Sequence, residues 1–112
     1  MSKFDEVVST CKDQMGKCGI DFDEDLLRAV AKGLGPSIYN KDALLVAAGD
    51  SAEVDGIKER FIAKKLGVSD AAQADAAIAH AVEKIGSSNR QKLRPVFYYL
   101  IVKHLSKEAV YD

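Results

Sequence analysis

The side chains that could bind a soft metal ion are two cysteines and two histidines, Cys11, Cys18, His80 and His104. No pair of them has the close spacing that zinc sites use. Both cysteines fall on the apolar face of one predicted helix, so we expect structural thiols. Seven residues of helix separate them by about 10.5 Å along its axis, too far for a disulfide. Because His104 lies on an apolar stripe, we expect it to be half-buried, and we predict no metal ion and no cofactor.

The acidic run DFDED, at residues 21–25, spaces its aspartates like the beginning of a calcium-binding loop. Such a loop also needs glycine at its sixth position and glutamate at its twelfth, where this chain has Leu26 and Lys32. The dipole of a following helix explains these acids without a metal. The chain also has no glycine-rich phosphate loop and no G-x-S-x-G nucleophile motif. We therefore expect a protein that is not an enzyme.

Basic side chains near the C-terminus form a third candidate site. Between Lys84 and Lys107 the chain has six Lys and Arg residues and no Asp or Glu. Cations beside an exposed aromatic ring can hold a nucleic-acid backbone or an acidic partner. The candidate partner-binding residues are Arg90, Lys92, Arg94, Tyr99, Lys103 and Lys107. Since the pI is near 6.1, nucleic acid is the alternative, and contact with another protein or with a second copy is the first interpretation.

The charge of the chain is divided between its two halves. Residues 1–55 carry a net charge of −5, from six basic and eleven acidic residues, and residues 56–112 carry +4, from ten and six. This division is compatible with an acidic or nucleic-acid partner, with attraction between the two halves of one domain, or with a solvated surface.

Short helices that end at glycine are the elements that would position these side chains. An apolar pattern at helical spacing ends in glycine five times, and lysine precedes four of these endings. Glycine adopts positive φ without a Cβ clash, and lysine in a last turn meets the negative end of the helix dipole. The predicted terminators are Gly19, Gly35, Gly49, Gly67 and Gly86. The predicted helices span residues 3–17, 23–34, 41–48, 51–66, 70–85 and 88–107.

The apolar run VFYYLIV, at residues 96–102, is predicted to lie in the helix at the centre of the core. On a helical wheel Phe97 and Ile101 share one face, whereas Lys92 and Tyr99 lie opposite. As a helix the run is about 10 Å long, far short of the roughly 30 Å that a membrane span needs. The predicted fold class is therefore all-α, a single compact array of about six short helices with the C-terminal helix central in the core.

Pro95 leaves two beginnings open for that last helix. A start at Ser88 places Pro95 inside the helix, where it leaves the Gln91 carbonyl unpaired and causes a kink. Alternatively, residues 88–93 form a turn and Pro95 opens the helix. The Ser-Ser-Asn sequence at residues 87–89 favours the first alternative.

Two long stretches of the chain resemble a known family. They are FDEVVSTCKDQMGKCGIDFDEDLLRAVAKGLGPSIYNKDALLVAAGDSAEVD at residues 4–55 and NRQKLRPVFYYLIVKH at residues 89–104. The sequence resembles a small bacterial family known as domain-of-unknown-function family 2853. This resemblance implies a compact multihelical array in a bacterial cytoplasm and supplies no activity, ligand or catalytic residue.

Length and composition are those of one globular domain over residues 1–112, with 47% hydrophobic and 29% charged residues. The N-terminal sequence MSKFDEVV lacks the apolar segment of a signal peptide, and two unpaired cysteines fit a reducing compartment. We therefore expect a cytoplasmic protein without membrane contact. Its expected function is that of a non-enzymatic protein-interaction or self-associating module.

Overall fold

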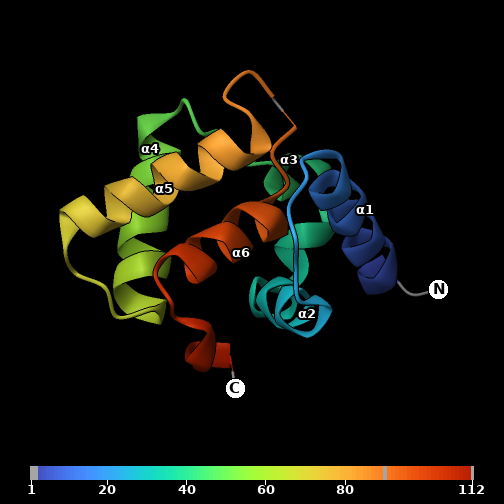
Figure 1. The fold of residues 1–112 in the computed structure, drawn as a ribbon, viewed down its shortest axis with the longest axis horizontal. Helices are drawn as coiled ribbons and strands as arrows, with labels where there is room; N and C mark the ends of the chain where they lie inside the picture. Colours follow the sequence, from blue (N-terminus) through green and yellow to red (C-terminus); the bar gives the residue numbers. More distant parts are fainter. Residues whose placement is uncertain (1–2, 90, 112) are drawn as a thin grey trace.

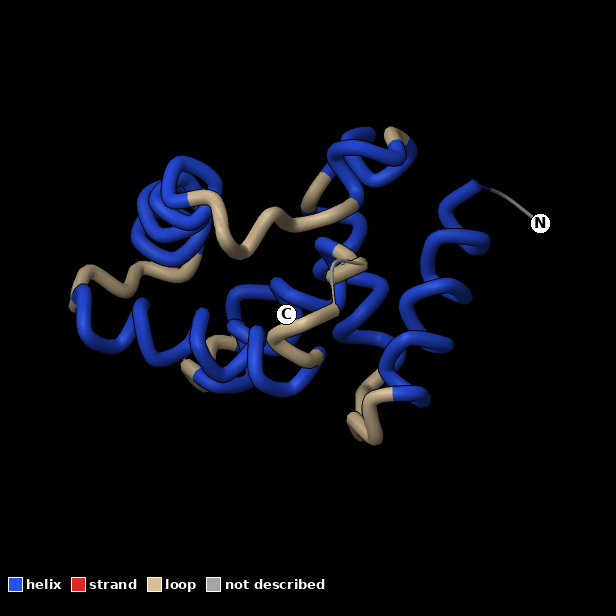
Figure 2. Tube along the Cα trace, turned by 90° about the horizontal axis from the view of Figure 1, so that it is seen from above, coloured by secondary structure: helices blue, strands red, loops and turns tan. Residues whose placement is uncertain are grey.

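The computed structural model describes residues 3–89 and 91–111 as helices joined by short connections (Figure 1). In chain order the elements are α1 (Lys3–Lys17), α2 (Glu24–Gly33), η1 (Gly35–Tyr39), α3 (Lys41–Leu44), α4 (Ser51–Gly56), η2 (Ile57–Lys65), α5 (Ala71–Ile85), α6 (Arg94–His104) and η3 (Glu108–Tyr111). The elements η1 and η3 are 3₁₀-helices, and η2 is a π-helix. Figure 2 shows only helices and loops along the described part of the chain. The predicted all-α fold is confirmed.

Helix α6 crosses the centre of the molecule and packs against α1, α2, α3 and α5 (Figure 1). Every side chain from Pro95 to Val102 is buried, and Phe97 and Ile101 are 0% exposed. The predicted central position of the C-terminal helix is therefore confirmed. None of the described helices is long and apolar enough to span a bilayer.

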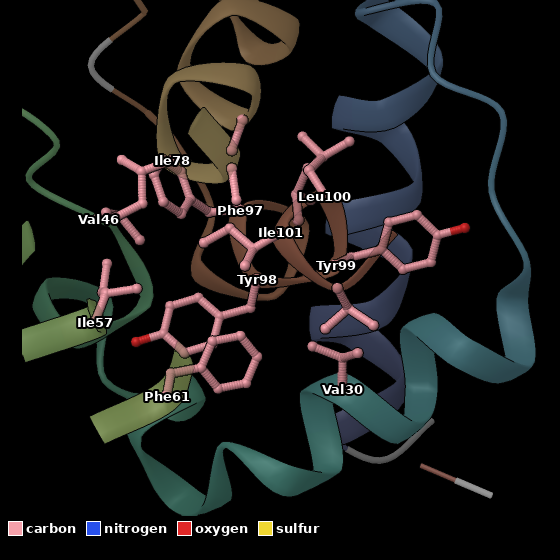
Figure 3. Packing of buried hydrophobic residues seen from close by; sticks show 14 of the residues in the cluster. Val30, Val46, Ile57, Phe61, Ile78, Phe97, Tyr98, Tyr99, Leu100 and Ile101 are labelled. Carbon is pink, nitrogen blue, oxygen red and sulfur yellow. The ribbon is translucent and has the colours of Figure 1, made fainter. Parts of the chain in front are cut away.

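The two tyrosines of α6 point to opposite sides of the helix (Figure 3). The ring of Tyr98 lies against Phe61 of η2, with ring centroids 4.3 Å apart. The hydroxyl of Tyr99 accepts a hydrogen bond of 2.8 Å from the backbone N–H of Asp23. Tyr99 is only 2% exposed, so its predicted position on a solvent face is wrong. The beginning of α2 covers this side of α6, which the wheel of a single helix cannot show.

Helix α6 begins at Arg94, so the alternative in which Pro95 opens the helix is correct and the predicted start at residue 88 is wrong. In the first turn the missing N–H of proline costs no helical hydrogen bond. The chain just before α6 is extended, and Leu93 forms an isolated antiparallel bridge with Leu45. The N–H of Val46 donates to the Lys92 carbonyl at 2.8 Å. This pairing joins two segments that lie far apart in the sequence.

The apolar stretch at residues 41–48 is helical only as far as Leu44. Leu45 has extended backbone, with φ −95° and ψ 142°. The second half of the predicted helix is therefore wrong, because the bridge to Leu93 requires an extended partner. Gly49 consequently follows a loop and terminates no helix.

Positive φ confirms four of the predicted glycine terminators, Gly19 (68°), Gly35 (73°), Gly67 (72°) and Gly86 (114°). After Gly19 the N–H of Ile20 donates to the Met15 carbonyl at 2.9 Å, which is the bond of a Schellman ending. Ser106 has the same role after α6, with φ 56°, and the N–H of Lys107 donates to the Val102 carbonyl at 3.0 Å. A serine there is strained, because its Cβ lies close to the following carbonyl oxygen.

The predicted helix over residues 51–66 changes its winding after α4. From Ile57 to Lys65 it is a π-helix, and the N–H of Leu66 bonds the Phe61 carbonyl, five residues earlier, at 3.0 Å. The buried residues of this segment are Ile57, Phe61, Ile62 and Leu66. Their spacing of about four to five residues matches the wider π repeat better than the α repeat. The π winding thus keeps these four side chains on the core side.

Candidate binding surfaces

The predicted partner-binding residues differ in their exposure to solvent. Arg90 lies outside the described residues. Lys92 and Tyr99 are buried, at 5% and 2% exposure. Lys107 is half-buried, whereas Lys103 is exposed and forms an ion pair of 3.4 Å with Glu108. The expected solvent exposure is therefore wrong for Lys92 and Tyr99.

Arg94 fastens the beginning of α6 to neighbouring segments. Its Nε donates to the Ala43 carbonyl at 2.6 Å, and one of its terminal nitrogens donates to the Tyr98 hydroxyl at 3.1 Å. Its Nη2 donates to the Leu45 carbonyl at 3.4 Å and forms an ion pair with Glu53. Burial raises the pKa of the Tyr98 hydroxyl, which stays a neutral partner for Arg94. The Arg94–Glu53 pair joins the basic half of the chain to the acidic half, which supports attraction between the two halves.

Lys92 is the one charged side chain that is buried among the described residues. Its Nζ donates to the Asn89 carbonyl, and it belongs to none of the ion pairs within residues 3–89 and 91–111. The side chain lines a hollow of about 670 Å³, which we call the Lys92 hollow. The other lining residues are Val46, Ala47, Ala48, Gly49, Val82, Ser87, Ser88 and Asn89.

The walls of the Lys92 hollow come from the α3–α4 connection, from α5 and from the α5–α6 connection. In Figure 1 both connections rise at the top of the molecule. The bridge between Leu45 and Leu93 and the bond from Val46 to Lys92 hold them together. The sequence did not predict this hollow, because it depends on the pairing of two loops.

Residues 9–109 match the model of a family described as "Protein of unknown function (DUF2853)". This chain belongs to the DUF2853 family. The predicted resemblance is confirmed, and the matched residues include the whole lining of the Lys92 hollow. A comparison with curated proteins found no match.

A second hollow of this DUF2853 domain lies beside Tyr39 and has a volume of about 250 Å³. We call it the Tyr39 groove; it is lined by Lys3, Glu6, Val7, Thr10, Ile38, Tyr39 and Leu44. Tyr39 is 46% exposed, and Val110, at 38%, is the other large hydrophobic residue exposed in the described part of the chain. In the sequence, an aromatic residue in a loop after Pro36 was the only sign of this surface.

The soft ligands of the DUF2853 domain lie in two separate places. His80 of α5 and His104 of α6 have ring centroids 4.7 Å apart, and His104 is exposed rather than half-buried as predicted. Cys11 is buried and free, as expected, and burial raises the pKa of its thiol to about 12. Cys18 is free but only partly buried, and its thiol donates to the Ile85 carbonyl at 3.6 Å. Within residues 3–89 and 91–111 no group of three or more His, Cys, Asp or Glu side chains could hold a metal ion.

The acidic run at residues 21–25 begins a helix, as its dipole interpretation predicts. The Asp23 carboxylate accepts hydrogen bonds from the N–H groups of Asp25 at 2.9 Å and Leu26 at 3.4 Å. The side chain of Glu24 forms ion pairs with Lys12 and Arg28, and these contacts lower the pKa of its carboxyl. These acids therefore cap α2 and tie it to α1.

Proposed function

We propose that this DUF2853 protein is a non-enzymatic interaction module that self-associates through the Tyr39 groove. The observation that carries the proposal is the 46% exposure of Tyr39 beside a groove with an apolar floor. Tyrosine is enriched at protein interfaces, because its ring supplies apolar contact area while its hydroxyl remains hydrogen-bonded to water. The floor of the groove includes Val7, Ile38 and Leu44, from α1, η1 and α3.

The charges beside the groove favour a second copy of the chain as its occupant. Lys3 and Glu6 have opposite charges and lie one helical turn apart in α1. Across a two-fold axis the Lys3 of one copy can face the Glu6 of the other, as an isologous interface requires. The net charge of −1 leaves little repulsion between copies. Since few large hydrophobic residues are exposed, we expect a weak dimer, with a buried area below roughly 1,200 Å².

The positions of three titratable groups with shifted pKa values support a non-enzymatic function. Cys11 lies in the core, Tyr98 lies in the Arg94 network, and Glu24 lies in surface ion pairs. An active site brings such groups together in one cleft, whereas these three serve packing and helix docking. The free thiols of Cys11 and Cys18 support the cytoplasm as the compartment, and the family resemblance supports a bacterial source.

Light scattering coupled to size-exclusion chromatography tests self-association from micromolar to millimolar concentration. We expect the average mass to rise toward that of a dimer, and Tyr39→Ser to keep the protein monomeric. Val110→Ser, at the other exposed hydrophobic residue, is the matched control and should dimerise like the natural sequence. A monomer throughout the range, or equal dimerisation of Tyr39→Ser, would contradict the proposal.

Nucleic-acid binding through the basic C-terminal residues stays a prediction. The burial of Lys92 and Tyr99 and the internal bonds of Arg94 leave Lys103 as the exposed, described cation of the predicted set. Retention on DNA or RNA at low salt, lost as salt rises, would support this alternative. The absence of retention at low salt would exclude it.

A further inference from the structure

We propose that the Lys92 hollow binds a small organic carboxylate with a short apolar body, anchored by the Lys92 ammonium. This site is separate from the Tyr39 groove, and the inference stands whether or not the protein dimerises. Its basis is a buried positive charge at the wall of a hollow, without a carboxylate of the described residues to balance it.

The hydrogen bonds of Lys92 are incomplete within the described protein. An ammonium group has three N–H donors, and the one acceptor that Lys92 reaches is the neutral Asn89 carbonyl. A buried charge is costly unless an opposite charge and further hydrogen bonds accompany it. An anion in the hollow supplies both. Among the described lining residues Lys92 is the one cation, which matches one negative charge, as on a carboxylate, whereas recognition of a phosphate favours several cations or a planar guanidinium.

The remaining walls suit the rest of such a ligand. Val46, Val82 and Ala48 supply apolar surface for a short hydrocarbon body, and Ser87 and Ser88 bring hydroxyl groups that can donate to the second carboxylate oxygen. The volume of about 670 Å³ falls within the roughly 300–1,000 Å³ of ordinary small-molecule sites. Because the Val46–Lys92 bond fixes one wall against the other, little ordering is needed on binding.

A titration of the ¹⁵N-labelled protein with isobutyrate, followed by NMR, tests the site. We expect saturable shifts of the amide signals of Ala47, Ala48, Ser87 and Ser88, and none with isobutyramide, which has the same shape without the charge. Lys92→Met should weaken binding about tenfold to a hundredfold, as loss of a charge-assisted hydrogen bond predicts. Lys64→Met is the matched control, at an exposed lysine outside the lining, and should bind isobutyrate normally.

Two further measurements separate loss of the anchor from a general loss of structure. Ala48→Phe fills the hollow while Lys92 stays in place, and it should abolish the isobutyrate shifts without changing the circular dichroism spectrum. Inorganic phosphate and a tetrapeptide ending in valine are titrated beside isobutyrate. Tighter binding of phosphate, or binding of the peptide without isobutyrate, would overturn the assignment to a small carboxylate. Shifts that Lys92→Met leaves unchanged would overturn the site itself.

Discussion

Residues 43–48 and residues 96–102 are both apolar stretches, yet their burial and their backbones differ. Every residue of the second stretch is buried, whereas in the first Val46 is buried, Ala47 is exposed and the others are half-buried. The second stretch lies within α6, and neighbouring helices surround it. The first leaves the helix at Leu45, and its Val46 N–H bonds the Lys92 carbonyl of the segment before α6. Every buried backbone N–H and C=O group needs a hydrogen-bond partner. In α6 these partners lie within the helix, whereas the first stretch finds them in another segment of the chain. Apolar content alone therefore fixes neither burial nor conformation, and the available backbone partners decide whether such a stretch stays helical.

Two cations at the beginning of α6 contribute to the same difference, Lys92 just before the helix and Arg94 as its first residue. Arg94 bonds the carbonyls of Ala43 and Leu45, and Lys92 bonds that of Asn89. Both side chains thus donate hydrogen bonds to backbone carbonyl groups that accept none within a helix. Positive charges that suggest a partner surface in the sequence stabilise irregular backbone in the fold, and only Lys92 also borders a hollow large enough for a ligand.

The largest expected effect is at the centre of α6. Phe97→Ala should lower the free energy of unfolding by about 3–5 kcal/mol, because it opens a cavity among completely buried side chains. Urea denaturation measures this loss. Val110→Ala, at an exposed residue, is the control and should change stability by less than about 0.5 kcal/mol. A loss of unfolding free energy for Phe97→Ala as small as that of the control would show that α6 does not lie in the core.

Arg94→Met should have the next largest effect, and it acts on the other stretch. We expect a loss of about 2 kcal/mol, since Glu53 and the carbonyl groups of residues 43 and 45 lose their donor while Glu53 stays partly buried. Hydrogen exchange should show faster opening at the Val46 amide, with α6 still protected. Arg94→Lys should be intermediate, because lysine keeps the charge without the planar fork. Unchanged exchange at Val46 would show that Arg94 does not hold this segment.

Ser106→Gly should stabilise the protein by about 0.5–1 kcal/mol. Glycine relieves the strain of φ 56° at the end of α6, although it also gives the unfolded chain more freedom. Ser87→Gly is the matched control, because Ser87 is a loop residue without positive φ, and it should not stabilise the protein. The urea denaturation midpoints of Ser106→Gly and Ser87→Gly, each compared with the natural sequence, measure the two changes in stability. Equal shifts would mean that the serine at 106 is unstrained.

The smallest expected effect is a pH dependence at the contact between α5 and α6. Burial, then the nearby His104 and Lys84, lower the pKa of His80, and Glu83 opposes them. The pKa of His80 in the folded protein lies below its usual value near 6.5. The neutral His80 side chain therefore contributes to folding stability, and this contribution is fully present above pH 6.5. It is lost as the pH falls below 6.5 through the folded pKa.

Urea midpoints measured from pH 8 downward test this sign. His80→Gln should flatten the profile, and His104→Gln should flatten it less, because the burial of His80 is the larger cause. A profile that His80→Gln leaves unchanged would assign the acid sensitivity to other groups.

The fold was more predictable from the sequence than the candidate sites were. The glycine endings at Gly19 and Gly67 and the acidic start of α2 at residues 21–25 depend on backbone geometry and charge within a few residues, so local sequence predicted them. The exposure of Lys92 and Tyr99 depends on which neighbour covers each side of α6, and a single helix carries no such information. The Lys92 hollow arises where two distant loops pair, so no local pattern could reveal it.

The sequence by itself determined that this chain is helical, where most of its helices end, and that residues 96–102 fill the core. Hydrophobic periodicity and the φ preference of glycine act over one or two helical turns. These features can therefore be predicted from the sequence without a structure. Only the tertiary structure decided that Leu45 is extended, that α6 begins at Arg94 with Pro95 in its first turn, and that Lys92 is buried beside a hollow. Each of those outcomes depends on hydrogen bonds and burial between segments far apart in the chain, whose partners exist only once the helices have packed.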